Sequence, residues 1–354
     1  MYDRTQTAVG LALVLATGVM SAAGRQSPQT DRQGPPRFKS GVDLVNVTAT
    51  VSDGAGRFVS GLRRDDFVMY EDDEPQTITQ FSAERVPVSL GLALDTSGSM
   101  AGEKIRSAQS ALSRFLAQLD ARDEMFLYRF SNEPVLLQGW TSDHQLLSQA
   151  LTTVTPRGGT AMYDAVARSI GLVATGRHQK KALVVISDGN DTLSRAGIAD
   201  VKRLIRDSDA LVYAIGIDGQ GPDVAPSPKI VPRAPFPMPP PYPGGRRRGP
   251  GRFFPAMQPQ TPGSTGGWVR HSSGERVNLT ALRDLTDDSG GRTEVITDAR
   301  DLNPATAGIA DELSRQYDMA YASSRDKDGR WHTIRVEVPG HLYRVRARRG
   351  YTAS

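Results

Sequence analysis

Three oxygen-bearing side chains stand at alternating positions directly after a short apolar segment. Residues 88–94 carry no charge, and Asp95, Ser97 and Ser99 follow them. Alternate residues of an extended chain point the same way, so we expect these three side chains to converge. Carboxylate and hydroxyl oxygens are the ligands that hard divalent cations such as Mg²⁺ prefer. The spacing therefore predicts a metal site at the end of a buried strand.

Two more polar groups stand where loops, strands and helices are expected to meet. Thr160 follows two glycines and precedes an apolar helical stretch, and Asp188 follows the apolar run 182–186. The parallel strands of an open α/β sheet end at one edge, where such sheets bind their ligands. We therefore expect Thr160 and Asp188 to project at the edge from which Asp95 projects.

Each of these residues also has an ordinary structural interpretation. Asp95 is of a type that closes turns, and Ser97, Ser99 and Thr160 are of types that cap helices. Asp188 and the glycine after it form a common turn sequence. One at a time, these interpretations are sufficient. Together, five such groups at the expected loop positions favour a cation site.

The pattern of apolar residues predicts a doubly wound α/β fold around these positions. Buried strands read as short apolar runs, and helices as apolar residues spaced by three or four. We expect a mostly parallel sheet of six strands within residues 87–322. The expected strands are 88–94, 124–130, 135–137, 182–186, 211–217 and 293–296, and the expected helices are 105–119, 146–151, 162–174, 198–205, 279–285 and 304–316.

Both flanks of this domain show the alternation of half-buried antiparallel strands. Residues 333–338 alternate aliphatic side chains with hydroxyl and charged ones. Neither 41–86 nor 323–354 is long enough to fold alone. We expect the two segments to pair in one small β-module. The acidic run 71–74 between two of its strands is interpreted as a solvated hairpin tip.

Three segments have a composition typical of a cleaved signal peptide or of disordered chain. Residues 1–23 resemble a signal peptide: a basic residue precedes the apolar run 8–20, which is shorter than the roughly 20 residues that span a bilayer. Residues 24–40 form an expected disordered tether. Residues 219–275 form an expected disordered insertion that carries a net charge of +5, which leaves −1 for the rest of the chain. The basicity therefore belongs to one segment, and the folded part is close to neutral.

The motifs Asp95-Thr96-Ser97-Gly98-Ser99, Gly158-Gly159-Thr160 and Ser187-Asp188-Gly189 resemble the metal-ion-dependent adhesion site of von Willebrand factor A domains. The flanks and the closing Arg349-Gly350-Tyr351 resemble a secreted, acidobacterial-type group of proteins related to that family. The resemblance covers residues 41–354 apart from the insertion.

The resemblance implies a role for each of the five site residues. Hydroxyls at the positions of Ser97, Ser99 and Thr160 bind the metal directly, whereas carboxylates at those of Asp95 and Asp188 act through bound water. The expected ion is Mg²⁺ or Mn²⁺. Because the hydroxyls are neutral, a carboxylate from a partner is the natural sixth ligand.

The sequence offers little support for other classes of function. There is no nucleophile elbow, P-loop or zinc-binding helix motif, and no cysteine. The five histidines lie in polar surroundings and are expected at the surface. The run Arg246-Arg247-Arg248 has no folded nucleic-acid reader around it, so we expect no nucleic-acid partner.

These observations predict an exported, non-enzymatic binding module. It would use a divalent cation to engage an acidic group on a partner protein or polymer, in the periplasm or outside the cell. The alternative is a structural subunit of an envelope complex in which the metal site is vestigial or only stabilising. No membrane span is expected after signal cleavage.

Overall fold

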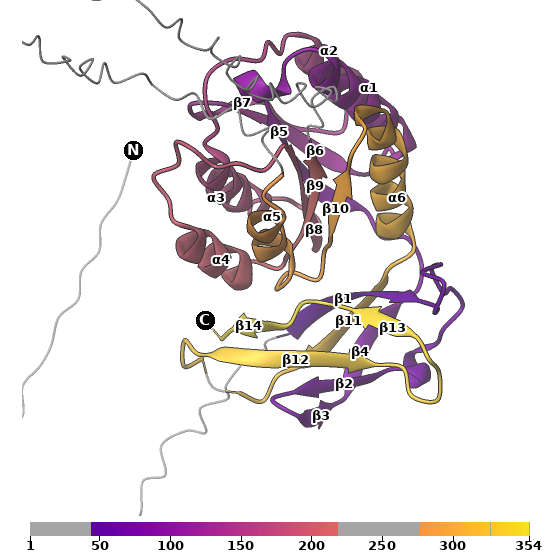
Figure 1. Ribbon diagram of the computed structural model, residues 1–354. Helices are drawn as coiled ribbons and strands as arrows, with labels where there is room; N and C mark the ends of the chain where they lie inside the picture. Colours follow the sequence, from indigo (N-terminus) through magenta and orange to yellow (C-terminus); the bar gives the residue numbers. More distant parts are fainter. Residues whose placement is uncertain (1–43, 219–276, 326, 354) are drawn as a thin grey trace, which may run out of the picture. The chain divides into compact units, whose positions relative to one another are not determined.

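The computed structural model describes residues 44–218, 277–325 and 327–353 (Figure 1). The expected signal peptide, tether and Pro/Arg-rich insertion lie outside these residues. Among the described helices, none is both long and apolar enough to cross a membrane.

A six-stranded sheet forms the centre of the α/β part of the chain, and its strand order is β10-β9-β8-β5-β6-β7. Neighbouring strands are parallel except for β7, which is antiparallel to β6 at one edge. Every residue of β5 is buried, as the apolar composition of this central strand requires. The predicted doubly wound, mostly parallel sheet is confirmed. Its strands are β5 (Val88–Asp95), β6 (Glu124–Phe130), β7 (Pro134–Thr141), β8 (Lys180–Ser187), β9 (Ala210–Ile217) and β10 (Thr293–Ile296).

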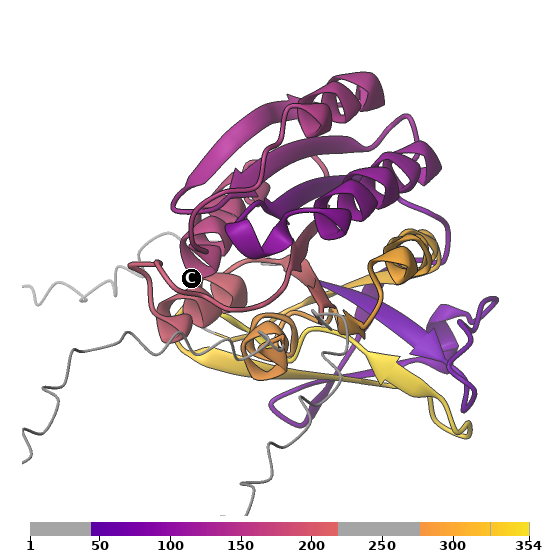
Figure 2. The ribbon, with the colours of Figure 1, turned by 45° about the horizontal axis from the view of Figure 1, so that its top comes forward.

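Helices cover both faces of this sheet (Figures 1 and 2). One hydrophobic core joins one face of the sheet to α1 (Glu103–Gln118), α2 (His144–Thr152) and α6 (Leu302–Ser314). A second core joins the opposite face to α3, α4 and α5. Alternate residues of β5 enter the two cores: Leu92 belongs to the first and Ala93 to the second. The remaining helices are α3 (Met162–Val173), α4 (Ile198–Asp207), α5 (Leu279–Thr286) and the one-turn η1 (Arg64–Asp66), η2 (Gly98–Met100) and η3 (Ala299–Asp301).

Two four-stranded antiparallel sheets form a β-module beside the α/β part. Their orders are β13-β1-β11-β4 and β14-β12-β2-β3, and they share one core. Each sheet combines strands from both ends of the sequence: β1 pairs with β11, and β12 pairs with β2. The strands are β1 (Leu44–Ser52), β2 (Val68–Glu71), β3 (Glu74–Gln76), β4 (Ile78–Ser82), β11 (Tyr317–Ala322), β12 (Trp331–Glu337), β13 (Arg344–Arg346) and β14 (Gly350–Thr352).

The hairpin tip between β2 and β3 departs from the solvated turn that its acidic sequence suggests. Asp72 and Asp73 adopt positive φ angles of 48° and 63° and make the turn. Glu71, however, is fully buried and accepts hydrogen bonds from the hydroxyls of Tyr351 and Ser323, at 2.5 and 3.0 Å. A run of four carboxylates contains no signal of this, because the two hydroxyl donors lie 252 and 280 residues away in the sequence.

Buried polar contacts connect the β-module to the α/β part. Glu312 of α6 is fully buried and accepts hydrogen bonds from Thr50 of β1 and Tyr213 of β9, both at 3.0 Å. Its carboxylate also pairs with Arg292 at 2.9 Å and with Arg346. This single carboxylate therefore ties three strands and a helix together.

Candidate metal centre

The loop after β5 brings the first three predicted residues together. The Asp95 carboxylate is buried, and its Oδ1 accepts a hydrogen bond from the backbone N–H of Ser97 at 2.8 Å. This bond closes the turn and directs Ser97 back over the end of the strand. The hydroxyl oxygens of Ser97 and Ser99 then lie 3.0 Å apart. The two serine hydroxyls thus lie together in the loop that follows β5.

Backbone hydrogen bonds place the Thr160 loop against this turn. The N–H of Gly98 donates to the carbonyl of Gly158 at 2.9 Å, and the N–H of Arg157 donates to the carbonyl of Thr96 at 2.8 Å. Gly158 has a φ of +78°, and a Cβ there would lie 2.4 Å from Oδ1 of Asn132. Glycine is thus required at this position for both conformation and space.

The last predicted residue, Asp188, reaches the site through Ser187 at the end of β8. The hydroxyl of Ser187 donates to Oδ2 of Asp95 at 2.5 Å. Asp188 is buried, and its Oδ2 accepts from the ammonium of Lys104 at 3.1 Å. Burial raises the pKa of Asp95 to about 6; the hydrogen bond from Ser187 opposes this shift and the neighbouring charge of Asp188 adds to it. Two buried carboxylates therefore share a site with one ammonium group.

Helix capping does not account for these side chains. Gly102 is the N-cap of α1, and the N-cap of α3 is Ala161, whose side chain cannot cap. The first N–H groups of α3 instead donate to the carboxylate of Asp191, from Met162 at 2.8 Å. Ser97 precedes η2 but makes no capping bond with its side chain. The hydroxyls of the site are thus not explained by the local structure that follows them.

Three residues that support the site carry no clear signal in the sequence. Ser187 orients Asp95, Lys104 neutralises part of the charge of Asp188, and Asn132 accepts the N–H of Gly159 at 2.7 Å. Ser, Lys and Asn are common in loops and first helical turns. For Lys104 alone, the sequence offers a signal: it lies five residues after Ser99, in the first turn of the helix that follows the motif.

The donor set fits a small, hard cation. Mg²⁺ takes six oxygen ligands at about 2.1 Å in octahedral geometry, so neighbouring ligand oxygens lie about 3.0 Å apart. The Ser97 and Ser99 hydroxyls have this separation. Among the described residues, no group of three or more Asp, Glu, His or Cys side chains is placed to hold a metal. A site here would thus be of the hydroxyl-rich kind, with the buried carboxylates in a supporting role.

Residues 90–190 match the family model of the von Willebrand factor type A domain. They run from within β5 to just past the end of β8 and contain all five predicted site residues. This part of the chain belongs to the von Willebrand factor type A family.

Several known proteins resemble parts of this chain. Inter-alpha-trypsin inhibitor heavy chain H4 of Bos taurus is 24% identical over 156 residues, which are 41% of this chain and 17% of that protein. Minor fimbrium subunit Mfa5 of Porphyromonas gingivalis is 28% identical over 116 residues, 30% of this chain and 9% of that protein. The chain thus matches less than a fifth of the length of these relatives.

A solved structure of a von Willebrand factor type A protein from Catenulispora acidiphila is also similar. The structural match covers 89% of this chain and 74% of the Catenulispora acidiphila chain. Its TM-score is 0.45 and its sequence identity 12%.

Proposed function

We propose that this protein is an exported, non-enzymatic binding module whose α/β domain holds Mg²⁺ or Mn²⁺ at a metal-ion-dependent adhesion site. Ser97, Ser99 and Thr160 are the direct ligands, and Asp95 and Asp188 act through bound water. The metal engages an acidic group on a partner protein or polymer.

The observation that carries this proposal is the 3.0 Å separation of the Ser97 and Ser99 hydroxyls above two buried carboxylates. Neutral hydroxyl ligands leave most of the charge of a dication uncompensated, because a hydroxyl contributes only a dipole. A carboxylate from outside is then the strongest available additional ligand. The buried carboxylates hold the ligand hydroxyls and waters in place, as Ser187 holds Asp95.

The location and the class of partner are part of the same proposal. The signal-like residues 1–23 support export to the periplasm or the cell exterior. One relative is, by its name, a subunit of a fimbrium, which supports a role in surface adhesion or assembly. The Ser97 and Ser99 hydroxyls lie 3.0 Å apart, which supports binding rather than catalysis as the role of the site.

A second candidate function is supported by the ion pair between Lys104 and Asp188. This ammonium group compensates one of the buried carboxylates without any metal. In a structural subunit of an envelope complex, the same contacts would only stabilise the loops, and assembly would depend on the β-module.

A pull-down from envelope extract separates the two functions. The full chain is immobilised with Mg²⁺ or with EDTA, and Ser97→Ala is compared with Ser113→Ala, which removes a hydroxyl from an exposed position of α1. We expect a partner that is retained with Mg²⁺ by the wild type and by Ser113→Ala, and lost with EDTA or with Ser97→Ala. Retention of the same partner by Asp95→Ala in EDTA would reject metal-dependent binding and favour the structural role.

A further inference from the structure

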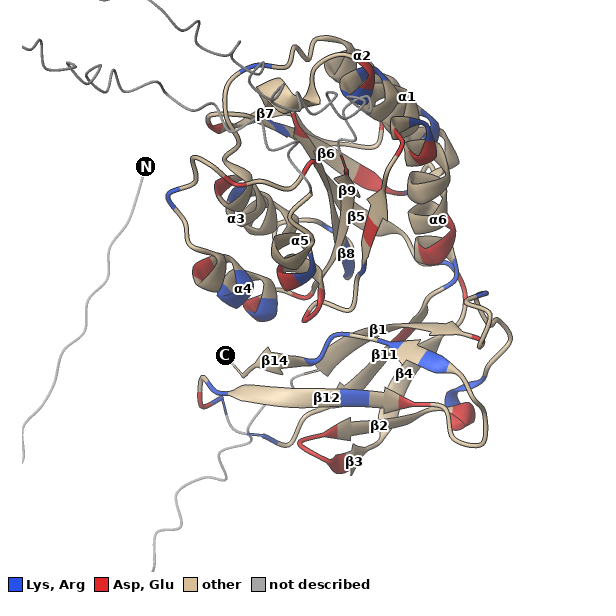
Figure 3. Cartoon of the chain, viewed as in Figure 1, with Lys and Arg blue, Asp and Glu red and all other residues tan. Residues whose placement is uncertain are grey.

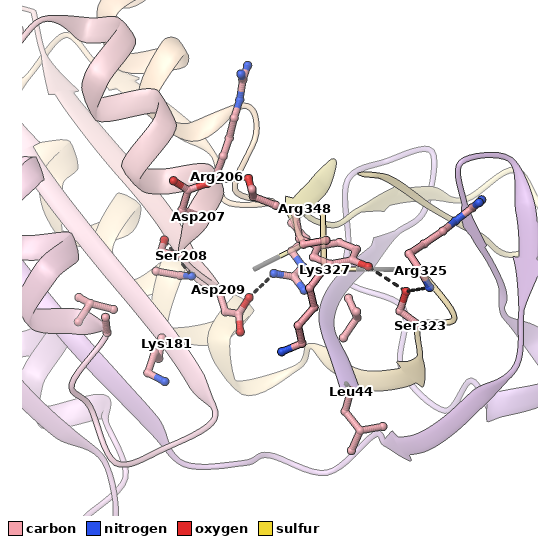
Figure 4. A pocket seen from close by; sticks show the side chains of 17 residues that line it. Leu44, Lys181, Arg206, Asp207, Ser208, Asp209, Ser323, Arg325, Lys327 and Arg348 are labelled. Atoms are coloured by element: carbon pink, nitrogen blue, oxygen red, sulfur yellow. Dashed lines mark hydrogen bonds and ion pairs between the residues drawn. The ribbon is translucent and has the colours of Figure 1, made fainter. Parts of the chain in front are cut away.

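A second candidate binding site lies at the opposite end of the parallel strands from Asp95. It is a cleft of about 350 Å³ between the α/β part and the β-module (Figure 4). Lys181 and Ala210, at the amino ends of β8 and β9, line one side together with the end of α4. Leu44 of β1 and Tyr351 of β14 line the other side. Asp95 stands at the carboxyl end of β5, so the cleft is separate from the metal centre.

The charged side chains that line this cleft are predominantly basic. Five carry a positive charge and two a negative charge, although Lys and Arg are interspersed with Asp and Glu over the folded part of the chain, which is nearly neutral as a whole (Figure 3). The basic residues come from both parts of the chain, two from the α/β part and three from the β-module. The charged lining residues are Lys181, Arg206, Arg325, Lys327 and Arg348, with Asp207 and Asp209.

Arg348 is the most deeply buried of the basic residues that line the cleft. Its side chain pairs with Asp209, and its guanidinium lies 5.7 Å from the centre of the Tyr351 ring. The residue is only 7% exposed, and its Nε finds no hydrogen-bond acceptor among the described residues. Half of the Asp209 side chain is exposed to solvent, so Arg348 has an incompletely neutralised charge. A buried cation of this kind favours an additional anion.

Lys181 carries the least compensated charge of the cluster. Within the described part of the chain, no ion pair or side-chain hydrogen bond involves its ammonium group. Arg206, by contrast, pairs with Asp288 at 2.8 Å, and Arg325 with Asp72 at 3.6 Å. The guanidinium of Arg348 and the ammonium of Lys181 therefore line the same cleft from two sides, and the positive charge of each is incompletely compensated by nearby carboxylates.

We infer that this cleft binds a small organic ligand through a phosphate or sulfate group. A tetrahedral oxyanion with three terminal oxygens matches a planar guanidinium fork and a flexible ammonium better than a single carboxylate does. The cleft is larger than an inorganic anion needs, and Val173, Ala174 and Ala210 provide an apolar wall for the organic part. Because the lining comes from two parts of the chain, the bound ligand joins the β-module to the α/β part.

The test uses the full chain in EDTA, with inorganic phosphate and inorganic sulfate as separate probes in calorimetric titrations. EDTA removes any contribution from the metal centre, so this test and the test of the proposed function fail independently. Lys181→Gln removes one charge from the cleft without breaking a native pair. Arg203→Gln removes one charge from an exposed pair on α4, outside the cleft, and is the matched control.

We expect at least one probe to bind saturably to the wild type and to Arg203→Gln, with dissociation constants that agree within a factor of two. Lys181→Gln should weaken that binding about tenfold, the effect of one charge-assisted hydrogen bond. Preference for phosphate or for sulfate then identifies the class of ester. Absence of saturable binding by the wild type, or equal affinity of the two variants, would overturn the inference. The comparison also accounts for non-specific binding by the arginine run at 246–248, which is the same in all three proteins.

Discussion

Lys104 is one of three residues of the candidate metal centre whose roles the sequence does not reveal, and its charge should oppose the cation. Its ammonium lies 3.1 Å from Oδ2 of Asp188, so a dication in the site would be repelled by it at short range. We expect Lys104→Gln to bind Mg²⁺ about tenfold more tightly than the wild type in calorimetric titration. Weaker binding by Lys104→Gln would show that Lys104 acts instead by holding Asp188 in position.

His332 illustrates how a single polar residue escapes prediction. The sequence placed it among surface histidines, but it is buried between Asp72, 2.8 Å from its Nδ1, and Asp328, 3.5 Å from its Nε2. Burial lowers the pKa of His332, but the hydrogen bond with Asp72 and the negative charges of Asp72 and Asp328 outweigh it and raise the pKa above its ordinary value. Arg325 also pairs with Asp72, at 3.6 Å.

A raised pKa in the folded state gives a stability that is present at low pH. The contribution of His332 is complete below the ordinary histidine value of about 6.5 and is lost as the pH rises through the folded-state pKa. We therefore expect the melting temperature of His332→Gln to lie further below that of the wild type at pH 6 than at pH 8. A difference that grows toward pH 8 would contradict the assigned ion pairs.

At the scale of elements, the strands and helices of the α/β part could be predicted because their apolar residues are periodic. The end of β5 is an example: an apolar run followed by alternating Asp and Ser predicts both a strand and a converging loop. The register and order of the β-module could not be predicted in this way. Tyr321 pairs with Val45 across some 270 residues of sequence, and alternation gives the face of each strand but not its partner.

Close approach between elements can be tested with two glycines. Gly291, in the loop that leads to β10, lies so near β9 that a Cβ would be 1.9 Å from the backbone carbonyl of Val212. Gly171, in α3, has no atom within 4 Å of such a Cβ. Gly291→Ala should lower the free energy of unfolding by about 3 kcal/mol because backbone must move. Gly171→Ala should raise it by about 0.5–1 kcal/mol, since alanine is the better helix former.

Urea denaturation at 25 °C measures both effects. Equal and small changes in the two variants would mean that the loop before β10 does not pack on β9 as described.

At the scale of the whole molecule, the contact between the α/β part and the β-module is built around the buried carboxylate of Glu312. Glu312→Ala leaves Arg292 and Arg346 without their shared carboxylate and removes the acceptor of Tyr213 and Thr50. Loss of one partner from a buried ion pair costs about 3–5 kcal/mol, and we expect a decrease of this size in the free energy of unfolding.

The matched control is Asp311→Ala on the same helix. Asp311 pairs with Arg315 at the surface, where both side chains are about half exposed. Such pairs contribute at most about 1 kcal/mol, so this variant should unfold close to the wild type. Similar stabilities of Glu312→Ala and Asp311→Ala in urea denaturation would show that the junction does not depend on Glu312.

The organisation of the chain could be predicted further than its junctions. That the two flanks share one β-module follows from the lengths of their alternating runs. The contact between α6 and β1 through Glu312 does not, because one glutamate in a helical sequence is usually solvated. Its burial depends on donors from Thr50, Tyr213 and two arginines, which only the folded chain assembles.

Titration of the metal tests the central claim most directly. Magnesium is titrated calorimetrically into the wild-type chain, into Ser97→Ala/Ser99→Ala, and into the control Ser113→Ala. The account predicts saturable binding of one Mg²⁺ by the wild type and by the control, and none by the double variant, because two of the direct ligands are gone. Equal binding of Mg²⁺ by the wild type and the double variant would contradict it.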